Sequence, residues 1–311
     1  MYNQEDMRKI FKLAIILLLC SEMQPSDTQL DSYEDRILYY RSDNNATIAT
    51  LDSSKYHASI RLKEKDGRYG AGHICSGALI APSVVLTAAS CVYNYADNKP
   101  YHPSELKVVL GSVARYQRHE QTLIYSVTHS YQQQTFDAIK LRDNLAILML
   151  ERDVPEMSAN IKPITLQAYN TNWYGKAGDK QFKVTTWLQT HEGLFLNPLM
   201  FLDAKKMDSE DCLKLYGPVY AAGMLCMSTA ESGMIHDIGS PLFLENKLIG
   251  VMSFSDGAKG PAIYTDVTYH SKWIREMIGD GRNKNSSVWG MLGFLALTWL
   301  ALKRTKYFKS S

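Results

Sequence analysis

Short runs of β-branched and other apolar residues, separated by turn residues, recur through the middle of the chain. Runs of this length at regular spacing are typical of a β-sandwich or of paired β-barrels. They comprise residues 57–80, interpreted as a hairpin with Asp66-Gly67 at its turn, and residues 82–89, 105–113, 122–130, 145–150 and 247–254. One helix is expected at residues 268–279, where Tyr269, Trp273 and Met277 fall one turn apart.

The cysteines indicate an oxidising compartment. Cys20 lies in an N-terminal apolar run, and Cys75, Cys91, Cys212 and Cys226 leave an even number, which predicts two disulfides outside the cell. These four lack the close C-x-x-C spacing of a structural zinc site, so we expect no metal and no cofactor. The formal net charge of +2 over 311 residues argues against nucleic acid as the main partner.

The N-terminus has the pattern of a secretory signal. Residues 7–20 begin with basic residues and continue as an apolar run that is too short to span a bilayer. Residues 1–21 are therefore predicted to be a signal peptide. Met7 is an alternative start, because the acidic prefix before it is unusual for such a segment. A buried N-terminal helix is the competing interpretation.

A second apolar segment, residues 288–302, precedes a basic tail, residues 303–311. A helix of this length covers roughly 22 Å, less than the roughly 30 Å of a hydrocarbon core. Snorkelling of Lys303 and Arg304 would extend it, and a glycolipid anchor cleaved near Gly279 is the alternative. A surface helix is disfavoured because the segment has no polar face. The segment predicts membrane attachment.

Between these ends the chain divides into a polar, turn-rich segment, residues 22–54, and a domain, residues 55–280. Asn45 and Asn285 begin acceptor sequons for N-glycosylation, which is consistent with a lumenal chain. We therefore expect a glycoprotein that is secreted or tethered at the cell surface.

Five blocks of sequence, in the right order and spacing, resemble the trypsin-like serine proteases of the chymotrypsin fold over residues 37–279. The blocks are CSGALIAPSVVLTAASC at 75–91, DNLAILML at 143–150, CLKLYGPVYAAGMLC at 212–226, HDIGSPLFLENKLIGVMSF at 236–254 and PAIYTDVTYHSKWI at 261–274. The resemblance implies an all-β fold of two six-stranded antiparallel β-barrels with a C-terminal helix. It also implies the disulfides Cys75–Cys91 and Cys212–Cys226.

The residues at the family's catalytic positions lack the family's chemistry. The resemblance places Ser90 at the histidine base, Asn144 at the aspartate and Ile238 at the serine nucleophile. A serine hydroxyl does not titrate near neutral pH, and a hydrocarbon side chain cannot attack a carbonyl. We therefore predict that the chain is not an enzyme. Residual hydrolysis through Ser240 or Ser232 is the alternative.

The loop before the nucleophile position differs as well. His236 replaces a glycine of the oxyanion loop, and Asp237 matches the residue that pairs with a new N-terminus in active family members. Cleavage after Arg36 would create such a terminus, but Ile37-Leu38-Tyr39 lacks the glycines that let it turn inward. We expect Asp237 to pair instead with His236 or with a backbone amide.

The resemblance further implies a specificity pocket whose base, Ser232, carries no acid for a basic substrate side chain. Met234 and Ala258 stand where the family has a disulfide, so we expect a looser, partly filled pocket. Its walls are predicted to include Ser253, Phe254, Ser255 and Ala262.

These features favour a non-catalytic serine protease homologue of the arthropod type that lacks a clip domain. We expect it to bind an extracellular protein, such as a protease, an inhibitor or a glycoprotein. The expected setting is reproduction, for example seminal fluid, or a protease cascade in which the chain is a cofactor. A membrane-tethered adhesion or structural protein is the alternative.

Overall fold

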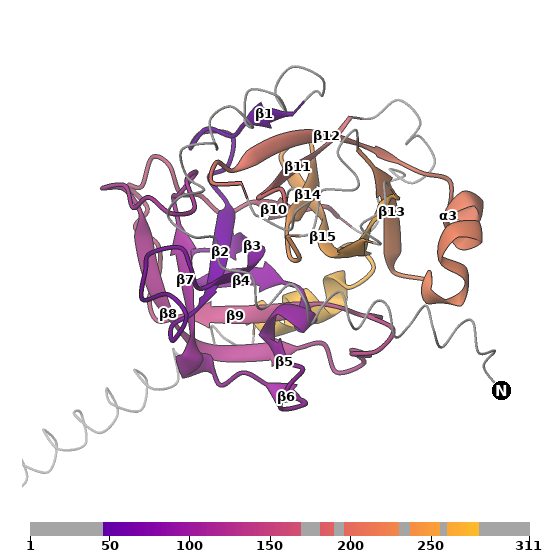
Figure 1. The fold of residues 1–311 in the computed structure, drawn as a ribbon, viewed down its shortest axis with the longest axis horizontal. Coiled ribbons are helices and arrows are strands. Elements are labelled where there is room, and N and C mark those ends of the chain that lie inside the picture. The colour runs from indigo at the N-terminus through magenta and orange to yellow at the C-terminus, as the bar shows by residue number, and fades with distance from the viewer. Residues whose placement is uncertain (1–45, 169–180, 190–195, 230–236, 256–259, 280–311) are drawn as a thin grey trace, which may run out of the picture. The chain divides into compact units, whose positions relative to one another are not determined.

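The computed structural model shows two antiparallel β-barrels and few helices (Figure 1). It describes residues 46–168, 181–189, 196–229, 237–255 and 260–279. The predicted signal peptide, the cleavage site at Arg36, the asparagines of both sequons and residues 288–311 lie outside the described residues. In the part of the chain that is described, no helix is long and apolar enough to cross a membrane.

The first barrel is a closed sheet of six strands. Its interior is filled by fully buried branched side chains, such as Ile60, Leu79, Leu86 and Ile147, as expected for a small barrel. In the order of pairing, the strands are β2 (His57–Leu62), β3 (His73–Ala81), β4 (Val84–Thr87), β9 (Ala146–Leu150), β8 (Leu123–Gln132) and β7 (Leu106–Leu110).

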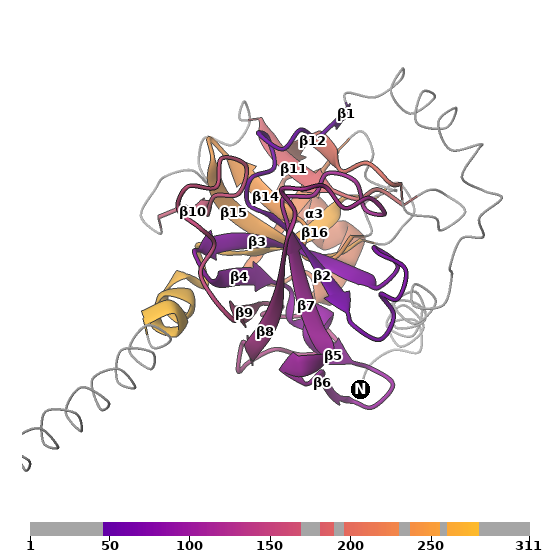
Figure 2. The same cartoon turned by 90° about the vertical axis from the view of Figure 1, so that its left-hand side faces the viewer.

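The second barrel is closed by pairing between its first and last strands, and its core includes Phe182, Val184, Leu242 and Tyr264. In order, its strands are β12 (Met200–Lys206), β11 (Phe182–Thr186), β14 (Pro241–Leu244), β15 (Lys247–Ser255), β16 (Ala262–Asp266) and β13 (Met224–Ser228). Two short strands add at its margins, β1 (Thr47–Ile48) beside β12 and β10 (Thr165–Leu166) beside β15. The two barrels lie side by side in both views (Figures 1 and 2). The predicted fold is confirmed.

The predicted hairpin is also present, as β2 and β3, with Ile60 opposite Cys75. Its connection is not a tight turn but the longer loop 63–72, which Asp66 holds at its base. The buried Asp66 carboxylate accepts the Gly72 N–H at 2.8 Å and lies 2.7 Å from the Lys107 ammonium.

The remaining elements are short. The helix α3 (Ser209–Tyr216) begins at Asp208, whose side chain accepts the Glu210 N–H. Three 3₁₀ turns, η2 (Ala89–Val92), η3 (Pro103–Glu105) and η5 (Gly217–Val219), and the β5 (Tyr93–Asn94) to β6 (Lys99–Pro100) hairpin complete the connections.

The C-terminal helix occupies residues 271–279 and is shorter than the predicted 268–279. Its buried apolar residue is Ile274, whereas Tyr269 precedes the helix in a turn and is 53% exposed. The prediction that Tyr269 lies on the apolar face of the helix is therefore wrong. The Asp266 carboxylate accepts the backbone N–H and the hydroxyl of Thr268, and these bonds hold residues 267–270 in a turn before the helix.

Both predicted disulfides are present. Cys75–Cys91 joins β3 to η2 with the Cα atoms 5.8 Å apart, and Cys212–Cys226 joins α3 to β13 at 6.3 Å. Each closes a loop of about fifteen residues, which corresponds to about 3 kcal/mol of stabilisation in the chain-entropy model.

Candidate functional site

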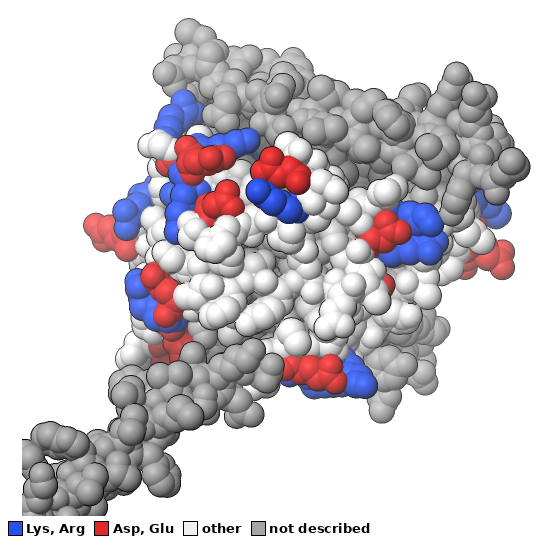
Figure 3. Space-filling model, turned by 90° about the horizontal axis from the view of Figure 1, so that it is seen from below, with Lys and Arg blue, Asp and Glu red and all other residues white. Residues whose placement is uncertain are grey.

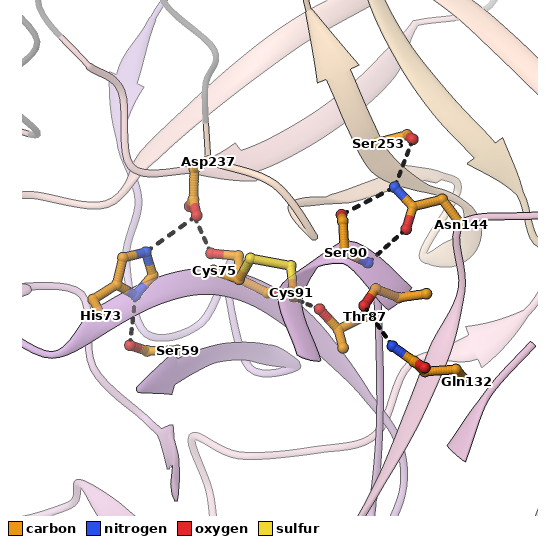
Figure 4. Close-up of a disulfide and its surroundings, with 12 residues drawn as sticks. Ser59, His73, Cys75, Thr87, Ser90, Cys91, Gln132, Asn144, Asp237 and Ser253 are labelled. Carbon is orange, nitrogen blue, oxygen red and sulfur yellow. Dashed lines mark hydrogen bonds and ion pairs between the residues drawn. A yellow bond between two sulfur atoms is a disulfide. The ribbon is translucent and has the colours of Figure 1, made fainter. Parts of the chain in front are cut away.

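Residues from both barrels meet at Asn144, which is fully buried directly before β9. Its Oδ1 accepts the backbone N–H of Ser90 at 2.8 Å, and its Nδ2 donates to the hydroxyls of Ser90 at 3.1 Å and Ser253 at 2.8 Å. Ser253 lies on β15 of the second barrel, so this group spans the junction (Figure 4). The positions that the resemblance assigns to base and acid therefore do come together, as an uncharged group.

The position of Ser90 is fixed by its neighbours. The chain leaves β4 at Thr87 and turns through η2, which the Cys75–Cys91 disulfide holds against β3. The Gln132 side chain on β8 donates to the carbonyl of Ala89 at 3.1 Å. The Ser90 side chain is thus presented by a turn that is tied on two sides.

Ile238 does not join this group through its side chain, which packs partly buried against the core of the second barrel. Its backbone keeps a fixed place, because the Ile238 carbonyl accepts the Ser76 N–H at 2.8 Å. Gly239 has φ +86°, and a Cβ there would lie 2.0 Å from the Ser76 carbonyl oxygen, so only glycine fits. The turn is preserved although the side chain before it is a hydrocarbon.

Asp237 lies at the centre of a second polar group, on the other side of the disulfide (Figure 4). Its buried carboxylate accepts from His73 Nε2 at 3.1 Å, from the Ser76 hydroxyl at 2.6 Å and from the Trp187 N–H at 3.0 Å. The expected backbone amide is thus present, whereas His236 lies outside the described residues. The sequence analysis missed His73 and Ser76, which precede Asp237 by more than 160 positions.

Two buried histidine rings connect this carboxylate to more distant hydroxyl groups, His73 directly and His57 through Ser76. Ser59 bonds to His73 Nδ1 at 2.8 Å, and Thr185 bonds to His57 Nδ1 at 2.9 Å. His57 Nε2 lies 3.0 Å from Ser76 Oγ, whose proton is already donated to Asp237, so His57 must be the donor there. This pattern assigns the proton of each neutral imidazole to Nε2.

Burial controls the charges in this group. Burial lowers the pKa of His57 to about 3 and that of His73 to about 4, although the Asp237 carboxylate raises both. Burial raises the pKa of Asp237, but His73, His57 and Ser76 together lower it more, so it lies below its usual value. At neutral pH the group therefore holds one carboxylate and two uncharged rings, with the Trp187 ring edge-on to both.

The predicted pocket walls are buried. Ser253 and Ala262 are fully buried, and Phe254 packs edge-on against the Tyr216 ring at 5.6 Å between centroids. Ser255 is 8% exposed. The predicted base and the two positions that lack the family disulfide lie outside the described residues, so a looser pocket stays a prediction.

Ser240, the alternative nucleophile, is fully buried, and its hydroxyl donates to Thr186 Oγ1 at 2.8 Å. Asp143, next to Asn144, points elsewhere, with its carboxylate 3.5 Å from the His270 ring. Among the described residues, no group of histidine, cysteine, aspartate and glutamate side chains is arranged to hold a metal ion.

Replacing Asn144 with alanine is expected to lower the free energy of unfolding by about 2–3 kcal/mol, because it leaves the Ser90 N–H buried without its acceptor. Replacing Ser253 with alanine removes one bond from the same group and should cost about 1 kcal/mol. Urea unfolding of both variants measures the difference. Equal losses for the two variants would show that Asn144 does not organise the group.

Comparison with known proteins supplies the family context. A family model described as Trypsin matches residues 45–274. Coagulation factor XII of Cavia porcellus is 30% identical over 232 residues, 67% of this chain and 37% of that protein. A vitellin-degrading protease of Bombyx mori is 30% identical over 223 residues, 68% of this chain and 79% of the relative. Trypsin eta of Drosophila erecta is 26% identical over 244 residues, 74% of this chain and 89% of the relative.

The match spans little more than a third of the coagulation factor XII proteins, and most of the length of the two insect relatives. The Bombyx mori relative is named as a protease and the Drosophila erecta relative as a trypsin, and together with the family match these names point to an enzyme. Our prediction that the chain is not an enzyme is therefore contradicted. It rested on three side chains, Ser90, Asn144 and Ile238. Their chemistry excludes the family's serine–histidine–aspartate mechanism, but it does not exclude hydrolysis by other groups.

Proposed function

Because the chain belongs to the trypsin family, we propose that it acts outside the cell by binding a polypeptide where its two barrels meet, around Ser90, Asn144 and Phe254. Two disulfides are typical of proteins from oxidising compartments and support the extracellular setting.

The Asn144 group is the observation that carries this proposal. The group contains no ionisable side chain, and its hydrogen bonds hold Ser90 and Ser253 of different barrels in one place. Ser90 Oγ accepts from Asn144, and its own proton has no acceptor among the described residues. That proton is free to bond a main-chain carbonyl, the acceptor that every polypeptide offers.

Apolar side chains flank this group and would receive side chains of the bound polypeptide. Leu141 and Phe254 belong to one buried cluster, against which Phe136 and Tyr216 pack with part of their rings exposed. Ile139, in the loop that leads to Asn144, is 70% exposed. Partly exposed aromatic rings give a large contact area at little cost in conformational entropy, so they suit recognition of apolar side chains.

Cleavage of the bound polypeptide is a second candidate, favoured by the relatives that are named as proteases. It would need a base other than Ser90 or Asn144 and a nucleophile other than Ile238, because none of these can fill the family role. Ser240 is buried and already donates its proton. Turnover is therefore measured alongside binding, as a separate readout.

The class of partner and the biological role are part of the same proposal. The partner is a protease, an inhibitor or a glycoprotein, and the role lies in reproduction or in a protease cascade. Cross-linking of the tagged full chain in its native tissue identifies the partner, and a partner that is not a protein would contradict this part.

Binding is tested with two probes, an unfolded labelled casein and a rigid loop inhibitor of serine proteases. We expect saturable binding of at least one probe by the full chain. Ile139→Glu should weaken it by about tenfold, the effect of roughly 1.4 kcal/mol. Met157→Glu is the matched control, since Met157 is 94% exposed and follows β9, whereas Asn144 precedes that strand.

Mass spectrometry of the casein from the same samples reports cleavage. Failure of both probes to bind, or equal binding by the Ile139 and Met157 variants, would remove the support for this binding site. Cleavage that depends on the full chain would establish the second candidate.

A further inference from the structure

We propose that the free edge of β8, beside η3, is a second polypeptide-binding surface, which takes an extended peptide of another protein as an added strand. This surface does not depend on the proposed function, because nothing in it requires a polypeptide at Ser90.

The edge is free because β7 covers only the first part of β8. Residues Leu110 to Lys107 of β7 pair with Leu123 to Ser126, and the chain before β7 then departs into η3. The rest of β8 pairs with β9 on one side alone. A strand left unpaired along one edge is a template for another extended chain.

The direction of the backbone groups follows from one bond. The N–H of Gln133 donates to the Leu145 carbonyl at 2.9 Å, toward β9. Because backbone groups alternate between the two edges of a strand, those of Gln132 and Ser130 point to the free edge. No described residue outside the strands bonds to these backbone groups, and β7 pairs with β8 only as far as Ser126. Two residues span about 6.6 Å, a spacing that another strand matches.

A cavity of about 450 Å³ adjoins this edge. It is lined by Ser130 and Gln132 of β8 and by Lys99, Pro100, Tyr101, His102, Pro103 and Glu105. The Ser130 hydroxyl is buried and has no hydrogen-bond partner among the described residues. Leaving such a group unbonded is costly, so a ligand that brings an acceptor to Ser130 removes a penalty that the free protein carries.

The charges near the cavity favour an uncharged occupant. Lys99 lies 3.7 Å from Asp97, and Glu105 accepts the backbone N–H of His102, so each has a local partner. Figure 3 looks at the molecule from the side on which β5 and β6 lie in Figure 1, and most of the described surface in its centre carries no charge. The two prolines and Tyr101 form an apolar wall, which suits the side chains of β-branched residues.

The test uses the isotope-labelled full chain and the peptide acetyl-Thr-Val-Thr-Val-Thr-amide. NMR hydrogen exchange should show that saturating peptide slows exchange of the Ser130 and Gln132 amides by at least tenfold. The same peptide with all five residue amides N-methylated lacks the donors of an added strand on both of its edges and should give no protection.

Variants separate this surface from the rest of the molecule. Ser130→Ala should lower the affinity for the peptide by three- to tenfold. Ser126→Ala, in the part of β8 that is already paired with β7, should leave the affinity unchanged. Ile139→Glu should also leave it unchanged, which keeps this test distinct from that of the proposed function. A thermal melt establishes that each variant is folded.

Three results would overturn the proposal. They are no protection by the peptide, equal protection by its N-methylated form, and equal weakening by the Ser130 and Ser126 variants. If the chain instead dimerises in sedimentation and Ser130→Ala abolishes the dimer, the occupant is a second copy of this chain and not another protein.

Discussion

Replacing Asp237 with alanine is expected to lower the free energy of unfolding by about 3–5 kcal/mol. The carboxylate accepts three hydrogen bonds, from the His73 ring, the Ser76 hydroxyl and the Trp187 amide, and all three donors are buried. Alanine leaves them without an acceptor at the contact between the barrels. In a domain of this size such a loss lowers the melting temperature by about 10 °C.

Asp203 provides the matched control, because it belongs to the same barrel and forms an ion pair with Lys183 at the surface, where its side chain is 35% exposed. Its replacement by alanine should cost no more than about 1 kcal/mol. Thermal and urea unfolding of both variants compare the two losses. A loss at Asp237 no larger than that at Asp203 would mean that the buried group does not hold the barrels together.

Acid is expected to destabilise the protein well above the range in which carboxylates titrate. An exposed histidine has a pKa of about 6.5, and the unfolded chain therefore takes up protons as the pH falls below that value. The folded chain does not, because burial lowers the pKa of His57 to about 3 and that of His73 to about 4. For each ring, the free energy of unfolding therefore falls by up to about 1.4 kcal/mol for every pH unit below about 6.5.

The loss begins near pH 6.5 and, for His73, continues to about pH 4. Asp237 acts in the same direction but only at lower pH, because its pKa in the folded state is depressed and its contribution disappears as it is protonated. Above pH 6.5 neither ring contributes a slope. The free energy of unfolding in urea, measured at four values between pH 7.5 and 4.5, follows this dependence.

His57→Gln removes one of three described rings whose pKa burial lowers, the third being His270. It should reduce the slope between pH 6 and 5 by roughly a third to a half, whatever it does to stability at neutral pH. A stability that is flat between pH 7 and 5 in the unmodified protein would show that the rings are not buried as neutral groups.

The fold could be predicted in detail because its signals are local. Alternating apolar runs place β4, β7, β9 and β15 within a few residues of their observed bounds. Element boundaries differ from the prediction where a side-chain hydrogen bond overrides the apolar pattern. Asp66 lengthens the loop between β2 and β3, and Tyr269 lies in a turn before the C-terminal helix.

The candidate site was predicted only in part. Ser90 and Asn144 do meet, as the order of the sequence blocks implied, but Ser253 completes their group from the other barrel. The conclusion drawn from the three catalytic positions, that the chain is not an enzyme, is contradicted by its protease-named relatives. Side-chain identity at a few positions excludes one mechanism, and it says less about what the whole domain does.

The positions of the strands and the chemistry of each site residue could be predicted from the sequence, as could the cysteine pairing that the family resemblance implies. What Asp237 binds and which edge of β8 is unpaired became clear only from the folded structure. His73 and Ser76 are separated from Asp237 by 164 and 161 residues, and no local pattern links them. Strand periodicity sets which side chains face inward, but only closure of the two barrels brings distant polar groups within hydrogen-bond distance, where burial then shifts their pKa values.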